Sequence, residues 1–155
     1  MMLEKIFPKI HQEGYKFLAI SVVLTLILWL ISDLFGFIFT LITIWVYYFF
    51  RDPERTIISD ENYLVSPADG LITAIKDTNG PIELGLENKT FTRVSIFMNV
   101  FNCHVNRSPS SGNIEDIFYK PGKFLNASLD KASEENERNY FKIKDGKTDD
   151  GIVVV

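Results

Sequence analysis

The sequence is poor in the residues that build disulfide bonds and metal sites. Its 155 residues include one cysteine, Cys103, and two histidines. A single cysteine excludes an intrachain disulfide, and so few thiol and imidazole groups argue against a zinc site. This composition fits a soluble part that faces the reducing cytoplasm. The patterns G-x-G-x-x-G, H-E-x-x-H and C-x-x-C are also absent from the sequence.

Positive charge is in short supply as well. The chain has 16 Lys and Arg residues against 20 Asp and Glu residues, which gives a net charge of −4. Nucleic-acid binding needs a basic face that neutralises phosphates, so this balance argues against nucleic acid as the main partner. Charge is also unevenly spread, because residues 17–50 contain one charged side chain, Asp33. The sequence therefore divides into an apolar N-terminal third and a polar remainder.

Two apolar runs occupy residues 17–31 and 37–50, and residues 32–36 (Ser-Asp-Leu-Phe-Gly) interrupt them. Each run is shorter than the roughly 20 residues that a straight membrane span needs. The Asp and Gly in the break favour a turn. We therefore expect a helical hairpin in the membrane, either a tight transmembrane pair or a shallow re-entrant one. A buried hairpin in a soluble protein is the alternative, but the remaining residues could hardly cover it.

Basic residues flank this hairpin on both sides, and the break between the runs contains none. Arg51 and Arg55 follow the second run, and three lysines precede the first: Lys5, Lys9 and Lys16. By the positive-inside rule, both ends of the hairpin face the cytoplasm. The sequence thus predicts a protein of the cell (inner) membrane whose polar part faces the cytoplasm.

The polar part reads as β-rich. Apolar runs with β-branched residues, separated by turn residues, predict strands at 70–76, 82–87, 91–101, 113–119, 139–144 and 151–155. The last two flank a turn rich in Asp and Gly, which favours a hairpin. Residues 128–138 look helical or irregular. We expect a mainly β, barrel- or sandwich-like domain, α+β overall, behind an N-terminal helical membrane hairpin.

The run at 91–101 has the composition of a strand that is buried on both faces. Its buried layer is expected to include Val94, Ile96, Met98 and Val100. The expected organisation is a cytoplasmic segment at 1–16, the membrane hairpin at 17–50 and a β-rich domain at 51–155. The sequence stops within the apolar run GIVVV, so this last domain is expected to be incomplete at its C-terminus.

Two short segments carry groups that could do chemistry. Ser66–Gly70 (SPADG) places the carboxylate of Asp69 in a tight turn beside a glycine. Phe97–Arg107 (FMNVFNCHVNR) places His104 just after the predicted buried strand, where a histidine can act as a general acid or base. Together they suggest an Asp–His pair. Taken alone, the first segment is more often a simple turn, and a histidine placed like His104 is more often structural.

Four segments in order resemble a known family: FFRDPER (49–55), VSPADG (65–70), RVSIFMNVFNCHVNRSPSSG (93–112) and PGKFLNASLDKASEENER (121–138). They are similar to the β-chain portion of the short bacterial phosphatidylserine decarboxylases. The resemblance covers essentially the whole chain, the N-terminal apolar pair included. Four motifs with matching order and spacing make it highly specific.

The resemblance implies a proenzyme of phospholipid biosynthesis that cuts itself at a Gly-Ser bond. The serine becomes a pyruvoyl group on the new α chain, and that group is the electron sink for converting phosphatidylserine to phosphatidylethanolamine. Asp69 and His104 match the family residues that assist self-cleavage. No metal and no dissociable cofactor is implied. Four basic residues are candidates for the lipid phosphate: Arg93, Arg107, Lys123 and Lys131. A homo-oligomer stays open.

The chain departs from the family pattern in two places. Arg107 stands where many long-form relatives have a second histidine, which leaves the division of duties for His104 open. None of the nine glycines is followed by serine. The sequence is therefore interpreted as an N-terminal fragment without the self-cleavage site, inactive by itself. Two alternatives remain: a non-catalytic, truncated, membrane-anchored β domain, and a decarboxylase of a related lipid such as archaetidylserine.

Overall fold

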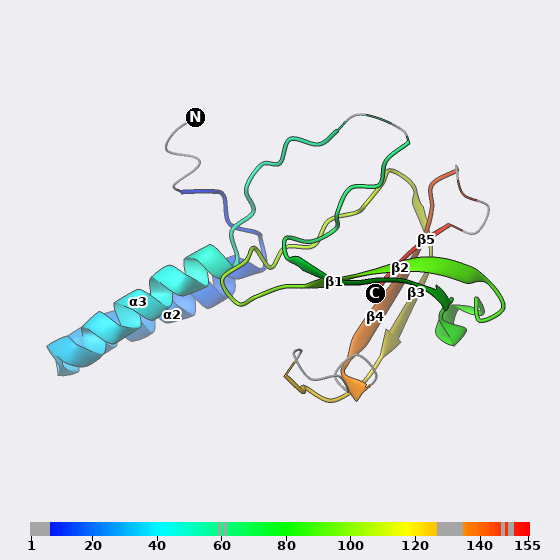
Figure 1. Ribbon diagram of the computed structural model, residues 1–155. Helices are drawn as coiled ribbons and strands as arrows, with labels where there is room; N and C mark the ends of the chain where they lie inside the picture. Colours follow the sequence, from blue (N-terminus) through cyan, green and yellow to red (C-terminus); the bar gives the residue numbers. More distant parts are fainter. Residues whose placement is uncertain (1–6, 59, 61, 127–134, 147, 149–150) are drawn as a thin grey trace. The chain divides into compact units, whose positions relative to one another are not determined.

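The computed structural model describes residues 7–58, 60, 62–126, 135–146, 148 and 151–155. The chain forms two compact units. Unit 1 combines Met1–Leu71 with Met98–Ser108, and unit 2 combines Ile72–Phe97 with Pro109–Val155. Two N-terminal helices belong to unit 1, and two small sheets form from the later strands (Figure 1). The predicted α+β composition with a helical hairpin is confirmed.

The hairpin consists of helix α2 (Gly14–Ile31) and helix α3 (Asp33–Phe49), which pack side by side (Figure 1). The break is narrower than predicted, because only Ser32 is extended, at φ −164° and ψ 133°. Asp33 and Gly36 lie in the first turn of α3 instead of in a turn between helices. An acidic residue is favourable at a helix N-terminus, where it meets the positive end of the helix dipole.

Small and hydroxyl side chains form the contact between α2 and α3. Thr25 Oγ1 lies 2.8 Å from Thr43 Oγ1 and donates to the Ser21 carbonyl at 2.8 Å. Trp29 Nε1 donates to Thr40 Oγ1 at 3.1 Å. Such residues let helix backbones approach closely and are typical of helix pairs in membranes.

The outward faces of both helices are apolar and exposed. Helix α2 is long and apolar enough to cross a membrane, and 11% of its most apolar window is buried in the protein. Helix α3 has the same apolar character but has 17 residues. The core helix of a soluble protein would bury far more of its surface, so these faces are consistent with contact to lipid.

Strands β1 (Leu71–Asn79) and β2 (Thr90–Phe97) form a two-stranded sheet. The strand predicted at 82–87 is wrong, because Ile82–Leu84 is a short 3-10 helix, η1. Its end is set by Gly85, whose φ of 64° lies in the left-handed region that favours glycine. The next residue, Leu86, is buried, and its backbone N–H donates to the Pro81 carbonyl at 3.1 Å.

The strand predicted at 91–101 is only partly correct. β2 ends at Phe97, and a turn follows in which Asn102 donates its backbone N–H to the Asn99 carbonyl at 2.8 Å. The predicted burial on both faces is wrong, since Val94 is 50% exposed and Val100 is 53% exposed. Ile96 and Met98 are half-buried. A two-stranded sheet has too few neighbours to cover both faces of this strand.

The second sheet contains β3 (Asn113–Lys120), β4 (Arg138–Lys144) and β5 (Ile152–Val154) in that order, all antiparallel. Its strands and the β4–β5 hairpin agree with the prediction. Tyr140 and Ile143 of β4 are buried. The barrel is not confirmed, because the strands of the described residues form separate two- and three-stranded sheets. Most of the stretch predicted helical or irregular, 127–134, lies outside the described residues.

Candidate functional site

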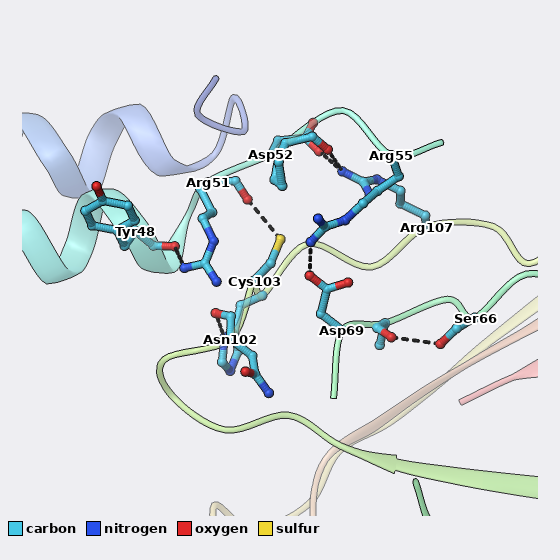
Figure 2. A network of polar contacts seen from close by, with 12 residues as sticks. Tyr48, Arg51, Asp52, Arg55, Ser66, Asp69, Asn102, Cys103 and Arg107 are labelled. Atoms are coloured by element: carbon cyan, nitrogen blue, oxygen red, sulfur yellow. Dashed lines mark hydrogen bonds and ion pairs between the residues drawn. The ribbon is translucent and has the colours of Figure 1, made fainter. Parts of the chain in front are cut away.

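Three of the segments singled out in the sequence meet in unit 1, where α3 ends. They are the residues after Phe49, the turn at 66–70 and the loop at 98–108 (Figure 2). Backbone hydrogen bonds fix the loop to the other two: His104 donates to the Phe49 carbonyl at 3.3 Å, and Arg107 donates to the Pro67 carbonyl at 2.8 Å. This meeting point is called the motif junction below.

Cys103 fixes the same loop from within. Its side chain is 2% exposed, and Sγ donates to the Arg51 carbonyl at 3.0 Å. A free buried cysteine behaves as a small apolar group with a weak donor, so its place here is structural. It holds the neighbouring His104 close to the end of α3.

Two Arg–Asp ion pairs tie the segment after α3 to its neighbours (Figure 2). Arg55 pairs with Asp69 of the turn, and Arg107 of the loop pairs with Asp52 and also donates to the Pro53 carbonyl at 2.7 Å. All four side chains are between 36% and 43% exposed. Pairs in such positions fix geometry more than they add stability.

His104 is held as an oriented ring. It stacks on Phe49 with ring centroids 4.0 Å apart and an interplanar angle of 16°. Nδ1 lies 3.1 Å from the Asn102 carbonyl oxygen. A carbonyl can only accept, so in the neutral ring Nδ1 carries the proton and Nε2 keeps its lone pair. Among the described residues, no group bonds Nε2, which leaves it able to accept a proton.

The structure brings Asp69 and His104 into one unit but gives each a different partner. Within the described part of the chain, no hydrogen bond joins their side chains: Asp69 is held by Arg55, and His104 by Asn102 and Phe49. The sequence pointed to both residues but missed these partners. The alternating charges of Arg51–Arg55 were the available signal for these ion pairs. Charged side chains that directly follow an apolar run find few partners within that run, so they pair with segments more distant in the sequence.

The other predicted residues are divided between the two units. In unit 2, Arg93 Nε donates to Ser95 Oγ at 3.1 Å, and Lys123 pairs with Glu135 at 2.6 Å. Arg107 belongs to the motif junction, where Asp52 engages it. Lys131 lies outside the described residues. The described residues contain no group of three or more His, Cys, Asp or Glu side chains that could hold a metal ion.

Residues 42–155 match the family model described as phosphatidylserine decarboxylase. The chain belongs to the phosphatidylserine decarboxylase family. The matched region begins within α3 and includes every residue of the motif junction after it. The family assignment that the four segments suggested is therefore confirmed.

Curated relatives of this decarboxylase family member are proenzymes. The phosphatidylserine decarboxylase proenzyme of Pelagibacter ubique (strain HTCC1062) is 63% identical over 153 residues, which is 99% of this chain and 71% of the relative. Those of Ruegeria pomeroyi and Cereibacter sphaeroides are 50% and 51% identical over 143 residues, or 92% of this chain. The chain spans 65% and 62% of their lengths.

Proposed function

We propose that this chain is the membrane-anchored β-chain part of a proenzyme that decarboxylates phosphatidylserine to phosphatidylethanolamine. The observation that carries the proposal is the motif junction, where an oriented histidine with an available Nε2 lies beside the end of a membrane-type helix. A lipid-modifying enzyme needs its reactive groups at the membrane surface. The names of the relatives supply the reaction.

His104 is proposed to accept the proton of the serine hydroxyl during self-cleavage. A serine attacks poorly unless a base takes its proton, and an imidazole with Nδ1 bonded to a carbonyl presents Nε2 for this purpose. The Asn102 carbonyl thus fills the orienting role that the sequence had suggested for a carboxylate. Stacking on Phe49 keeps the ring from turning.

Asp69 is proposed to act in self-cleavage through the turn that carries it. Its carboxylate accepts from Arg55, and Ser66 Oγ donates to the Ala68 carbonyl at 2.8 Å within the same turn. An acceptor fixed in this way can position the cleavage segment by hydrogen bonds to its backbone N–H groups.

The pyruvoyl group would supply the electron sink that decarboxylation requires. The sequence contains no Gly-Ser pair, so the serine from which it forms would come from a segment outside these 155 residues. The chemistry of the junction fits the formation of this group, because an available imidazole nitrogen is the base that serine activation needs. We propose that the chain alone does not decarboxylate lipid.

The test joins this chain to the C-terminal segment of the Pelagibacter ubique relative and follows self-cleavage on a denaturing gel. His104→Ala should slow cleavage by about two to four orders of magnitude. His11→Ala is the matched control, since His11 is the other histidine and its ring accepts from the Glu13 N–H, outside the motif junction. Release of carbon dioxide from phosphatidylserine should appear only after cleavage. Normal cleavage in the His104 variant would refute the role of that residue.

We also propose that both ends of the hairpin face the cytoplasm, as the flanking cations suggest. The test places single cysteines at exposed positions of the tip, Leu34→Cys, and of the flank, Glu54→Cys. Buried Cys103 contributes little background labelling. An impermeant maleimide should label the tip in intact spheroplasts and the flank only after lysis. Labelling of the flank in intact spheroplasts would reverse the orientation.

A further inference from the structure

A groove of about 630 Å³ lies along the C-terminal half of α3, wholly within unit 1. Its apolar wall is formed by α3 side chains together with Phe101 of the loop at 98–108: Leu41, Ile44, Trp45 and Phe101. Its polar end contains Arg51 and Arg55. The groove therefore joins an apolar surface to two guanidinium groups.

Arg51 is the unusual member of this groove. Its Nη1 donates to the Tyr48 carbonyl at 2.7 Å, and its Nη2 donates to the Phe101 carbonyl at 3.2 Å. Its guanidinium carbon also lies 5.9 Å from the centre of the Tyr48 ring. Among the residues that the structure describes, no carboxylate pairs with Arg51. The side chain is thus oriented by neutral groups while its charge stays without a counter-ion from the protein.

The wall of the groove has the height of a lipid chain segment. Leu41 to Phe49 covers about 12 Å along the axis of α3, at 1.5 Å per residue. Leu41 and Ile44 are about half exposed, and Trp45 Nε1 donates to the Val100 carbonyl at 3.1 Å. A tryptophan with an apolar ring and a bonded N–H is typical of the membrane interface, so Arg51 lies at headgroup level.

We propose that this groove binds an anionic glycerophospholipid. The phosphate lies on Arg51, an acyl chain follows Leu41 and Ile44, and the headgroup points toward Arg55 and its partner Asp69. Arginine matches a phosphate through parallel N–H donors, which gives this end of the groove its preference for anionic lipid. Phosphatidylserine and phosphatidylglycerol should both bind. The inference rests on insertion of the hairpin and is independent of decarboxylation.

Quenching of Trp45 by brominated lipid tests the proposal. The chain has two tryptophans, so Trp29→Phe leaves Trp45, which lines the groove, as the only indole. Vesicles hold phosphatidylcholine with a fixed fraction of phosphatidylglycerol, and the bromine label is placed on one lipid or on the other. At constant surface charge, quenching then reports which lipid occupies the groove. The labelled phosphatidylglycerol should be enriched at Trp45 about fivefold over its bulk fraction, the amount expected for one interfacial cation.

Arg51→Gln should abolish the enrichment. Lys16→Gln is the matched control, because it removes the same charge at the same end of the hairpin. Lys16 itself pairs with Glu13 and does not line the groove. If the two substitutions lowered the enrichment equally, the enrichment would be due to the general surface charge, and the proposed site would be refuted. Enrichment close to one in the parent protein would overturn it as well.

A second measurement uses the chain with both tryptophans in place. Native mass spectrometry of the detergent-released protein should retain one phosphatidylglycerol, and Arg51→Gln should lose it while Lys16→Gln keeps it. Retention of phosphatidylcholine to the same extent would contradict the proposal. Neither readout uses carbon dioxide release, so an inactive protein that still selects anionic lipid would separate this site from the proposed reaction.

Discussion

Gly36 should be intolerant of even one extra carbon. A Cβ added at this position would lie 2.6 Å from Trp29 Cγ and 2.8 Å from Trp29 Cε2, both within the rigid indole of the facing helix. The indole ring cannot shift without breaking the hydrogen bond from its Nε1 to Thr40 Oγ1, which is 3.1 Å long. Gly36→Ala therefore sets a packing clash and a lost interhelical hydrogen bond against a gain in helix propensity.

The three contributions can be compared. Overpacking by one carbon costs about 1–3 kcal/mol. A hydrogen bond between membrane helices is worth about 0.6 kcal/mol. Replacing glycine by alanine in a helix returns about 1 kcal/mol. We expect a net loss of about 1–2 kcal/mol in the stability of the hairpin.

The assay is reversible unfolding of the intact chain in bicelles, followed by the far-ultraviolet circular dichroism of the helices, which every variant retains. Ala19→Gly on the exposed face of α2 calibrates the propensity contribution in the same hairpin. Trp29→Leu in the Gly36→Ala background should recover part of the loss, since the smaller side chain makes room. A stabilisation of about 1 kcal/mol by Gly36→Ala, the value for propensity alone, would show that α2 and α3 do not pack as described.

Two further predictions concern ion pairs. A double-mutant cycle of Arg107→Ala and Asp52→Asn should give a coupling of about 1 kcal/mol in chemical unfolding, because both side chains are more than a third exposed; strictly additive effects would refute the pairing. In unit 2, a hydrogen bond from Lys120 lowers the pKa of Glu83 below its ordinary 4.5. This pair should stabilise the fold above pH 4.5 and lose its effect as pH falls through the lowered pKa. Glu83→Gln should therefore be less stable at pH 7, with a difference that shrinks in acid; a difference independent of pH would contradict this.

The helices could be predicted closely because their cause is local. Fifteen or so apolar residues in sequence have few alternatives to a helix that faces lipid. The break was misjudged for one local and one tertiary reason: Asp33 suits the first turn of a helix, and Gly36 is needed where Trp29 of the facing helix crosses. Residues 82–87 alternate like a strand, yet Pro81 and Gly85 enclose a tight turn that the alternation conceals.

The candidate site was predictable in its residues but not in its pairing. His104 stands out because it follows an apolar run among polar neighbours. The partners of Asp69 and Arg107 lie 14 and 55 residues away in the sequence, on the segment that leaves α3. Such pairing depends on the path of the chain, and no local pattern specifies it. The prediction that Val94 and Val100 are buried failed for a related reason, since composition does not reveal how many strands a sheet will have.

For a hairpin that inserts into the membrane as proposed above, the one-residue joint at Ser32 constrains how the two helices can enter a bilayer. With a single extended residue between α2 and α3, neither helix can complete its insertion while the other remains in water. The pair must cross together, led by its tip. Moving Asp33 across is the only charge transfer required, at a cost of about 2.5–3.5 kcal/mol at the bilayer centre. In the orientation proposed above, every lysine and arginine would stay on the side of synthesis, so insertion would not require translocation of a folded domain.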